Sequence, residues 1–128
     1  MITRNVGFAM GYAALIILTA LAAALANGQG WIPDSMPDRV LGIVMGITIV
    51  IFSNPVAKRL PGEASNPAKA AFKRFFALVM VLAGLGHSLV WLLAPIDLAN
   101  WIAISVVLTG FVLIAARTLF KGTGPASE

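Results

Sequence analysis

The sequence contains no cysteine, a single histidine and few charged residues. Without cysteine, neither a disulfide bond nor a thiolate metal site can form. Charged residues make up 11% of the 128 residues, whereas soluble proteins carry about 25%. Apolar residues make up 59%. The composition therefore excludes an ordinary soluble domain and indicates an integral membrane protein.

The apolar residues form four long blocks, each able to cross the ~30 Å hydrocarbon core of a bilayer as a helix of about 20 residues. The first block, Val6 to Ala26, is longer than the apolar region of a signal peptide, about 7–15 residues, so we expect it to be retained. We predict a single four-span transmembrane domain over residues 1–128, with a disordered tail at 121–128. The fold class is all-α, a membrane four-helix bundle with helices at about 5–26, 37–52, 67–94 and 98–120.

The basic residues are distributed unevenly among the connectors of these blocks. Eight of the nine Lys and Arg residues precede the first block, follow the fourth, or lie between the second and third. By the positive-inside rule, this predicts a bacterial inner-membrane protein with both termini and the middle loop in the cytoplasm. The ninth cation, Arg39, shares an outer connector with Asp34 and Asp38. The other eight are Arg4, Lys58, Arg59, Lys69, Lys73, Arg74, Arg117 and Lys121.

The three tryptophans provide an independent test of this topology. Trp31, Trp91 and Trp101 all fall at the predicted outer ends of the spans. Indole rings prefer the membrane interface, where both the apolar ring and the N–H group are satisfied. Their positions agree with the depths that the charges predict.

Small residues at four-residue spacing indicate where helices approach one another. Gly7 and Gly11 form a GxxxG pair in the first block, and Gly42 and Gly46 form a second. Small residues drive helix association in lipid because they let backbones come close. Two interpretations stay open: packing inside one bundle, or contact with a second copy or a partner's helix. The same alternatives apply to the weaker pair Gly84 and Ser88.

The third span proper is expected to run from about Phe75 to Ala94. His87 is the sole ionisable side chain in the part of the predicted helices that crosses the membrane, with Ser88 on the adjoining face. An ionisable residue at membrane depth is a candidate functional residue by default. Proton transfer would need a relay partner, yet no Asp, Glu, Lys, Arg or Tyr lies deep in the same half of the membrane. The structural alternative is a neutral histidine hydrogen-bonded to a Ser, a Thr or a carbonyl oxygen on another helix. His87 and Ser88 are therefore the candidate functional polar residues.

The sequence contains few residues that could catalyse a reaction or bind a cofactor. It contains no nucleophile–base pair, phosphate-binding loop or metal-ligand cluster, and a bis-histidine haem would require His87 from two subunits. We therefore expect no catalytic residue, no metal and no cofactor. The cations beside the spans suit anionic headgroups, so we expect the lipid bilayer as a partner and no nucleic acid. A homo-oligomer or a larger membrane complex is the other expected assembly.

The segment GIVMGITIVIFSNPVAKRLP, from Gly42 to Pro61, ends an apolar span in Asn, followed by Lys and Pro. Together with the basic, aromatic entry to the next span, it resembles the SdpI-like family of bacterial membrane proteins over Gly42 to Leu85. The loop departs from that family, because Gly62 to Asn66 replaces its Gly-Ile-Arg-Thr-Pro-Trp-like segment. The resemblance implies toxin immunity or membrane sequestration of a regulator. The basic-loop candidates are Asn54, Lys58, Arg59, Pro61, Lys69, Lys73 and Arg74.

Two functions are compatible with these observations. The first is a non-enzymatic accessory, immunity or regulatory protein that binds a membrane partner through a helix face or the cytoplasmic loop. The alternative is a small oligomeric channel or transporter with His87 on the path. The first is favoured by the glycine pairs and the uncharged spans, the second by the histidine.

Overall fold

The computed structural model contains four α-helices and describes residues 2–58 and 67–121, with side chains over 6–55 and 67–120. Each helix includes a stretch long and apolar enough to cross a membrane, and the described residues contain no strand. The predicted all-α, four-span fold is therefore confirmed, although several helix ends differ. Most of the predicted tail at 121–128 lies outside the described residues. The helices are α1 (Ile2–Gly28), α2 (Met36–Lys58), α3 (Pro67–Leu93) and α4 (Ile96–Lys121).

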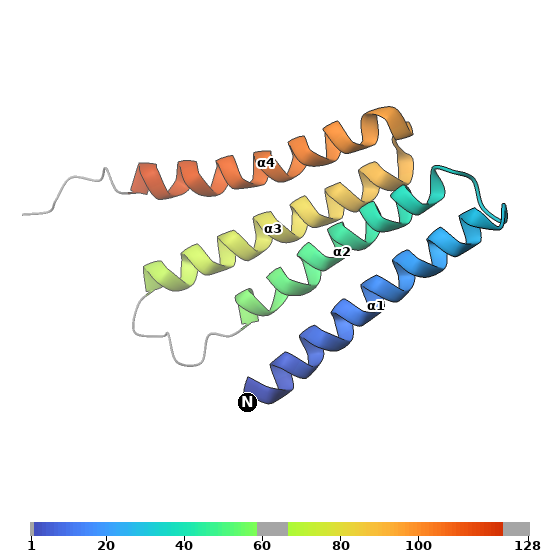
Figure 1. Ribbon diagram of the computed structural model, residues 1–128. Helices are drawn as coiled ribbons and strands as arrows, with labels where there is room; N and C mark the ends of the chain where they lie inside the picture. Colours follow the sequence, from blue (N-terminus) through green and yellow to red (C-terminus); the bar gives the residue numbers. More distant parts are fainter. Residues whose placement is uncertain (1, 59–66, 122–128) are drawn as a thin grey trace, which may run out of the picture.

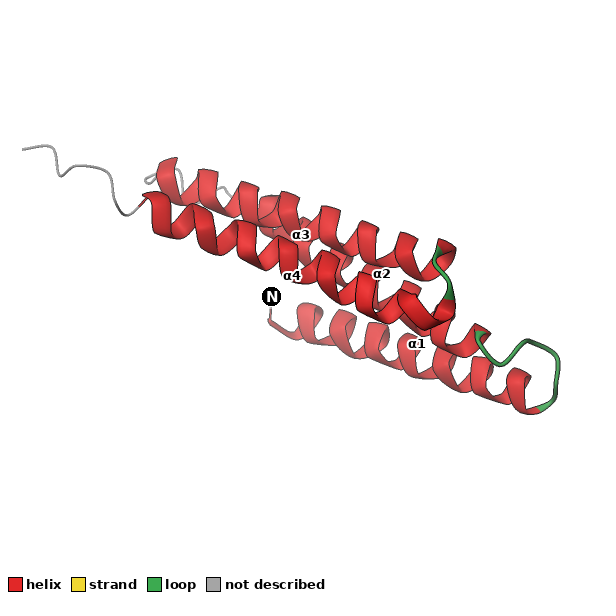
Figure 2. Ribbon diagram, turned by 90° about the horizontal axis from the view of Figure 1, so that it is seen from above, coloured by secondary structure: helices red, strands yellow, loops and turns green. Residues whose placement is uncertain are grey.

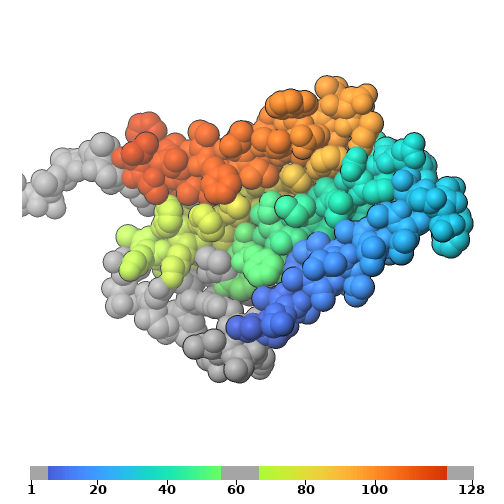
Figure 3. Space-filling view, viewed as in Figure 1, coloured from blue at the N-terminus to red at the C-terminus, as the bar shows by residue number. Residues whose placement is uncertain are grey.

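Neighbouring helices in the chain are neighbours in space, and they run in alternating directions (Figure 1). The α2–α3 interface is the most extensive, the α3–α4 interface is second, and the α1–α2 interface is the smallest of the three. As a result, α1 lies at one edge of the molecule (Figures 2 and 3). We call the end with the α1–α2 and α3–α4 connections the Trp end, because it carries Trp31, Trp91 and Trp101. We call the other the basic end, because it carries Lys69, Lys73, Arg74 and Arg117.

The end of α1 is fixed by a glycine cap. The amide of Trp31 donates to the carbonyl of Ala26 at 2.9 Å, and the amide of Gly30 donates to that of Asn27 at 2.8 Å. This pair of bonds defines a Schellman motif, whose left-handed position is occupied by Gly30 with φ 72°. This glycine cap lets α1 continue to Gly28 instead of ending at the predicted Ala26.

α2 extends further than predicted at its second end. It begins as expected, with the carbonyl of Ser35 accepting a bond from the amide of Arg39 at 3.2 Å. The predicted end at Phe52 is wrong, because α2 continues through Pro55 to Lys58. Proline removes one backbone donor and crowds the preceding turn. Because Pro55 lies one turn from the end of α2, this weakens only the last two turns of the helix.

The α3–α4 connection is a tight turn around Pro95. α3 begins at Pro67 as predicted, where the missing N–H of proline is harmless. The carbonyl of Pro95 accepts bonds from the amides of Leu98 and Ala99, at 3.0 and 2.9 Å. α4 therefore begins at Ile96, earlier than the predicted Leu98.

Small residues dominate the buried interior. Ala99 and Ala103 of α4 are completely buried, whereas the leucines of α1, α3 and α4 mostly point outward. This is the expected pattern for a bilayer, in which leucine gains little by leaving lipid and small residues allow close helix contact. The buried positions of α3 and α4 are Ala77, Val79, Ala83, Gly84, Ala99, Ala103, Gly110 and Ile114.

Arg39 joins the start of α2 to the end of α3. Its guanidinium donates to the carbonyl of Trp91 at 2.7 Å and to that of Ala94 at 2.9 Å, with a longer bond to Leu92 at 3.4 Å. The last carbonyls of a helix have no partner within the helix and carry partial negative charge. The last turn of α3 contains no basic residue of its own. Arg39, the one exception to the charge asymmetry, therefore serves as the cationic cap of a neighbouring helix.

Candidate functional site

His87 lies on α3 at the edge of a pocket of about 300 Å³. The pocket is formed by three helices near the Trp end, and most of its lining is apolar. Its polar members are Asp38 from α2, His87 from α3 and Asn100 from α4. The remaining lining residues are Leu41, Gly42, Met45 and Trp91.

The pocket lies between one face of α2 and one face of α3, each made of residues three or four positions apart. Asp38, Gly42 and Met45 are four and three residues apart, so they share one face of α2. His87 and Trp91 are one turn apart on α3. The ring of Trp91 occupies the space that a side chain at Gly42 would need. Gly42 is thus required for the indole to form a wall of the pocket.

The imidazole of His87 lacks the predicted partner. Its Nδ1 is buried and makes no hydrogen bond within the described part of the chain. The prediction of a histidine bonded to Ser, Thr or a carbonyl on another helix is therefore wrong for this nitrogen. A buried polar atom without a partner costs roughly 1–3 kcal/mol, so His87 stays a candidate functional residue.

Ser88 forms the interhelical bond instead. Its hydroxyl donates to the carbonyl of Ile43 on α2 at 3.0 Å. The hydroxyl also lies against Gly46, where a side chain would collide with it. Ser88 therefore belongs to the α2–α3 interface, and of the two predicted polar residues only His87 lines the pocket.

Asp38 and Asn100 are the pocket residues that sequence reasoning missed. Asp38 was counted as a connector charge, but it lies in the first turn of α2 and faces the same pocket as His87. Its spacing to Gly42, one helical turn, was the available signal. The pocket thus offers a carboxylate, an amide and an imidazole to a ligand. Over the described residues, no group of three His, Cys, Asp or Glu side chains could hold a metal ion.

The structure divides the predicted glycine faces into two classes. A Cβ on Gly46 would stand 2.5 Å from the carbonyl oxygen of Gly84, and a Cβ on Gly84 would stand 2.7 Å from that of Gly46. With Gly42 against Trp91, these three glycines form the α2–α3 contact. Gly7 and Gly11 have no atom within 4 Å of the same position. Their face of α1 is open.

α1 is attached to α2 at a polar contact near its middle. Thr48 donates its hydroxyl proton to the carbonyl of Val44 at 2.7 Å, so in the 3.0 Å contact between Tyr12 and Thr48 the tyrosine is the donor. The Tyr12 ring also packs edge-on against Phe52, with centroids 5.8 Å apart. Ala23 is the one buried side chain among the described residues of α1.

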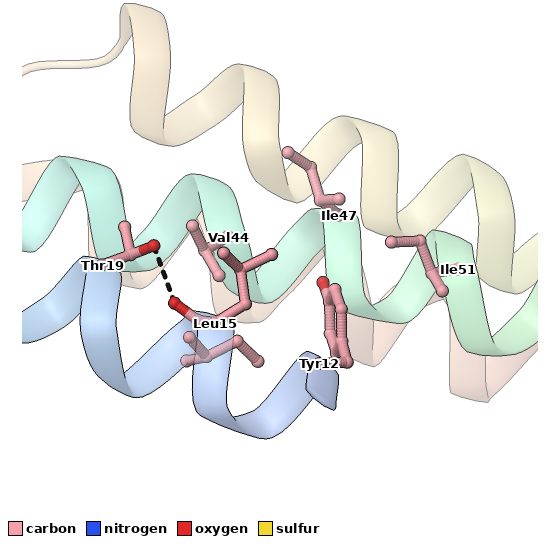
Figure 4. Close-up of a pocket in the computed structure, with 7 residues that line it drawn as sticks. Tyr12, Leu15, Thr19, Val44, Ile47 and Ile51 are labelled. Atoms are coloured by element: carbon pink, nitrogen blue, oxygen red, sulfur yellow. Dashed lines mark hydrogen bonds between the residues drawn. The ribbon is translucent and has the colours of Figure 1, made fainter. Parts of the chain in front are cut away.

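Between these attachment points, the two helices enclose an apolar pocket of about 250 Å³ (Figure 4). Tyr12 and Thr19 lie towards its two ends, and the Thr19 hydroxyl is bonded to the carbonyl of Leu15 in its own helix at 2.8 Å. The pocket shows that α1 is separated from α2 over part of its length. Its lining residues are Tyr12, Leu15, Ile16, Thr19, Val44, Ile47 and Ile51.

The basic-loop candidates are only partly within the described residues. Arg59, Pro61 and the side chain of Lys58 lie outside them. Asn54 and Arg74 are exposed and line a common pocket at the basic end. Lys69 is exposed and Lys73 is half-buried, both in the first two turns of α3.

Fold and span composition define the chain as a multi-pass membrane protein. No protein-family model, curated protein or solved structure matches it. The resemblance to the SdpI-like family therefore stays a prediction.

Proposed function

We propose that this chain is a non-enzymatic accessory, immunity or regulatory protein of the bacterial inner membrane, with both termini cytoplasmic. It acts by binding a membrane partner through the open face of α1. The observation that carries the proposal is the contrast between two glycine pairs of identical spacing. The space beside Gly42 and Gly46 is filled by α3, whereas no atom of the described residues lies within 4 Å of where a side chain would begin at Gly7 or Gly11.

The limited attachment of α1 supports the same role. Apart from Ala23, no described side chain of α1 is buried, and an apolar 18-residue stretch of this helix is 0% buried, compared with 22% for such stretches of α3 and α4. A helix that packs so little within its own chain has most of its surface available to a second helix. A GxxxG face is suited to such a contact because it allows close backbone approach.

Replacing both Gly7 and Gly11 by isoleucine should dissociate the protein from its partner without unfolding it. Isoleucine keeps the helix apolar but blocks close approach of another helix. The measurement is the mass of the full-length chain purified in mild detergent, by light scattering and by identification of bound proteins. We expect a complex for the wild type and a monomer for the variant.

Ala13→Ile is the matched control, because Ala13 is exposed and lies about 200° around α1 from Gly11. It should retain the complex. A wild-type chain that is monodisperse, monomeric and free of bound protein would contradict the proposal. So would a complex that survives the double substitution.

The His87 pocket favours a second candidate function, an oligomeric small channel or transporter. Its support is the convergence of Asp38, His87 and Asn100 from three helices on one pocket, with a buried and unpartnered imidazole nitrogen. Polar groups at membrane depth commonly mark a pathway for ions or substrates. In this role the carboxylate of Asp38 lies at the entrance and His87 lies deeper.

His87→Ala should then lower proton or small-ion flux at least about tenfold in liposomes that contain the purified protein, an effect equivalent to about 1.4 kcal/mol. Thr109→Ala is the control, because the Thr109 hydroxyl is bonded within its own helix, to the carbonyl of Ser105 at 2.8 Å. Wild-type protein without flux, or flux that is the same in His87→Ala, would exclude this role.

A further inference from the structure

A crevice at the basic end is polar at one end and apolar at the other, as a phospholipid molecule is. It has a volume of about 340 Å³ and lies between α2 and α3. Asn54 and Arg74 supply its polar groups, and Ala77, Leu78 and Val81 supply its apolar lining. The four α3 residues follow the spacing of one helical face, so the crevice becomes apolar as α3 leaves Arg74.

Among the described residues, the charges at the basic end are all positive. The described carboxylates, Asp34, Asp38 and Asp97, all lie at the Trp end. Lys69 and Lys73 precede Arg74 on α3 and add to the positive potential. An anion entering the crevice from the basic end therefore meets cations without a competing described carboxylate.

Arg74 is the cation available to such an anion. Within the described part of the chain it forms no hydrogen bond, ion pair or ring contact, and its side chain is exposed. The other two arginines whose side chains are described are engaged. Arg39 caps α3, and the guanidinium of Arg117 lies 4.0 Å from the ring centroid of Phe75.

We propose that this crevice binds one anionic phospholipid. The planar guanidinium of Arg74 presents paired N–H donors that match a phosphate group. The amide of Asn54 donates to a second headgroup oxygen, and one acyl chain lies along Ala77, Leu78 and Val81. The site is independent of the α1 face and of the His87 pocket.

Two features favour an anionic lipid over the alternatives. A free phosphate would leave the apolar part of the crevice uncovered, whereas an acyl chain covers it. A zwitterionic lipid would bring its own ammonium group beside Arg74 and Lys73. Basic pockets between transmembrane helices commonly select anionic headgroups for this reason.

The test is native mass spectrometry of the full-length protein released from detergent, with phosphatidylglycerol or phosphatidylcholine of identical acyl chains added. The wild type should retain phosphatidylglycerol preferentially. Arg74→Gln should reduce that retention about fivefold or more, the effect of losing one cation near a membrane surface, about 1 kcal/mol. Arg117→Gln, which removes a cation at the same end, should leave it unchanged. Val81→Phe, which fills the apolar part, should also reduce it.

Three outcomes would overturn the proposal. The first is equal retention of the two lipids by the wild type. The second is an equal loss in Arg74→Gln and Arg117→Gln, which would indicate a general basic surface instead of a site. The third is displacement of phosphatidylglycerol by inorganic phosphate alone, or full retention in Val81→Phe, which would indicate a headgroup contact without the acyl chain.

Discussion

Replacing Gly46 by alanine should destabilise the folded protein by about 3 kcal/mol, although alanine is ordinarily the better helix former. The new Cβ would stand 2.5 Å from the carbonyl oxygen of Gly84 and 2.8 Å from the amide nitrogen of Ser88. Both are backbone atoms of α3, so no side-chain rotation relieves the contact and the two helices must separate. Unfolding in detergent, followed by circular dichroism, measures the effect.

Gly11→Ala is the matched control for this prediction. It makes the same chemical change in another GxxxG pair, at a position with no atom within 4 Å. It should leave the free energy of unfolding unchanged or raise it slightly, because alanine favours the helix by up to about 1 kcal/mol. Equal effects of the two substitutions would show that the α2–α3 contact is not the main stabilising interface.

Replacing Arg39 by glutamine should cost about 2–3 kcal/mol of stability. Hydrogen bonds to a charged group contribute about 1.5–3 kcal/mol each, and Arg39 makes two short ones, to the carbonyls of Trp91 and Ala94. Because the guanidinium is partly exposed to solvent, we expect the two hydrogen bonds together to contribute an amount near the lower end of this range. Arg39→Lys should recover part of the loss, because lysine keeps the charge but lacks the planar fork.

The control for this second effect is Arg74→Gln, which removes a cation that has no partner among the described residues. In detergent without anionic lipid, it should unfold like the wild type. If Arg39→Gln were as stable as Arg74→Gln, the cap on α3 would have no energetic role. The α3–α4 turn would then hold through its backbone bonds to Pro95 alone.

The sequence alone predicted four helices because their signal is local. Hydropathy marks the spans, and Gly30 marks the end of α1 through its backbone conformation. The end of α2 was misplaced at Phe52, because Pro55 lies inside the final turn of the helix instead of ending it. Such a proline removes a single bond, and the chain continues as a helix.

The candidate site was predictable only in part, because it depends on which faces meet. His87 stood out as the one ionisable residue within a span. Its neighbours Asp38 and Asn100 come from other helices, and a local pattern does not show the rotation of one helix relative to another. The same holds for the glycine pairs. Gly11 and Gly46 are each the second glycine of a GxxxG pair, but α3 packs against Gly46 and no described atom lies close to Gly11.

Arg39 also has a consequence for the order of biogenesis. Its acceptors on Trp91 and Ala94 are 52 and 55 residues further along the chain. During synthesis the guanidinium therefore emerges well before the carbonyls that later bind it, and it stays hydrated until α3 is in place. α2 is accordingly synthesised before the carbonyls that bind the positive charge near its first turn. The carbonyls at the end of α3 then bind that charge, so this contact between α2 and α3 can form only after α3 is complete.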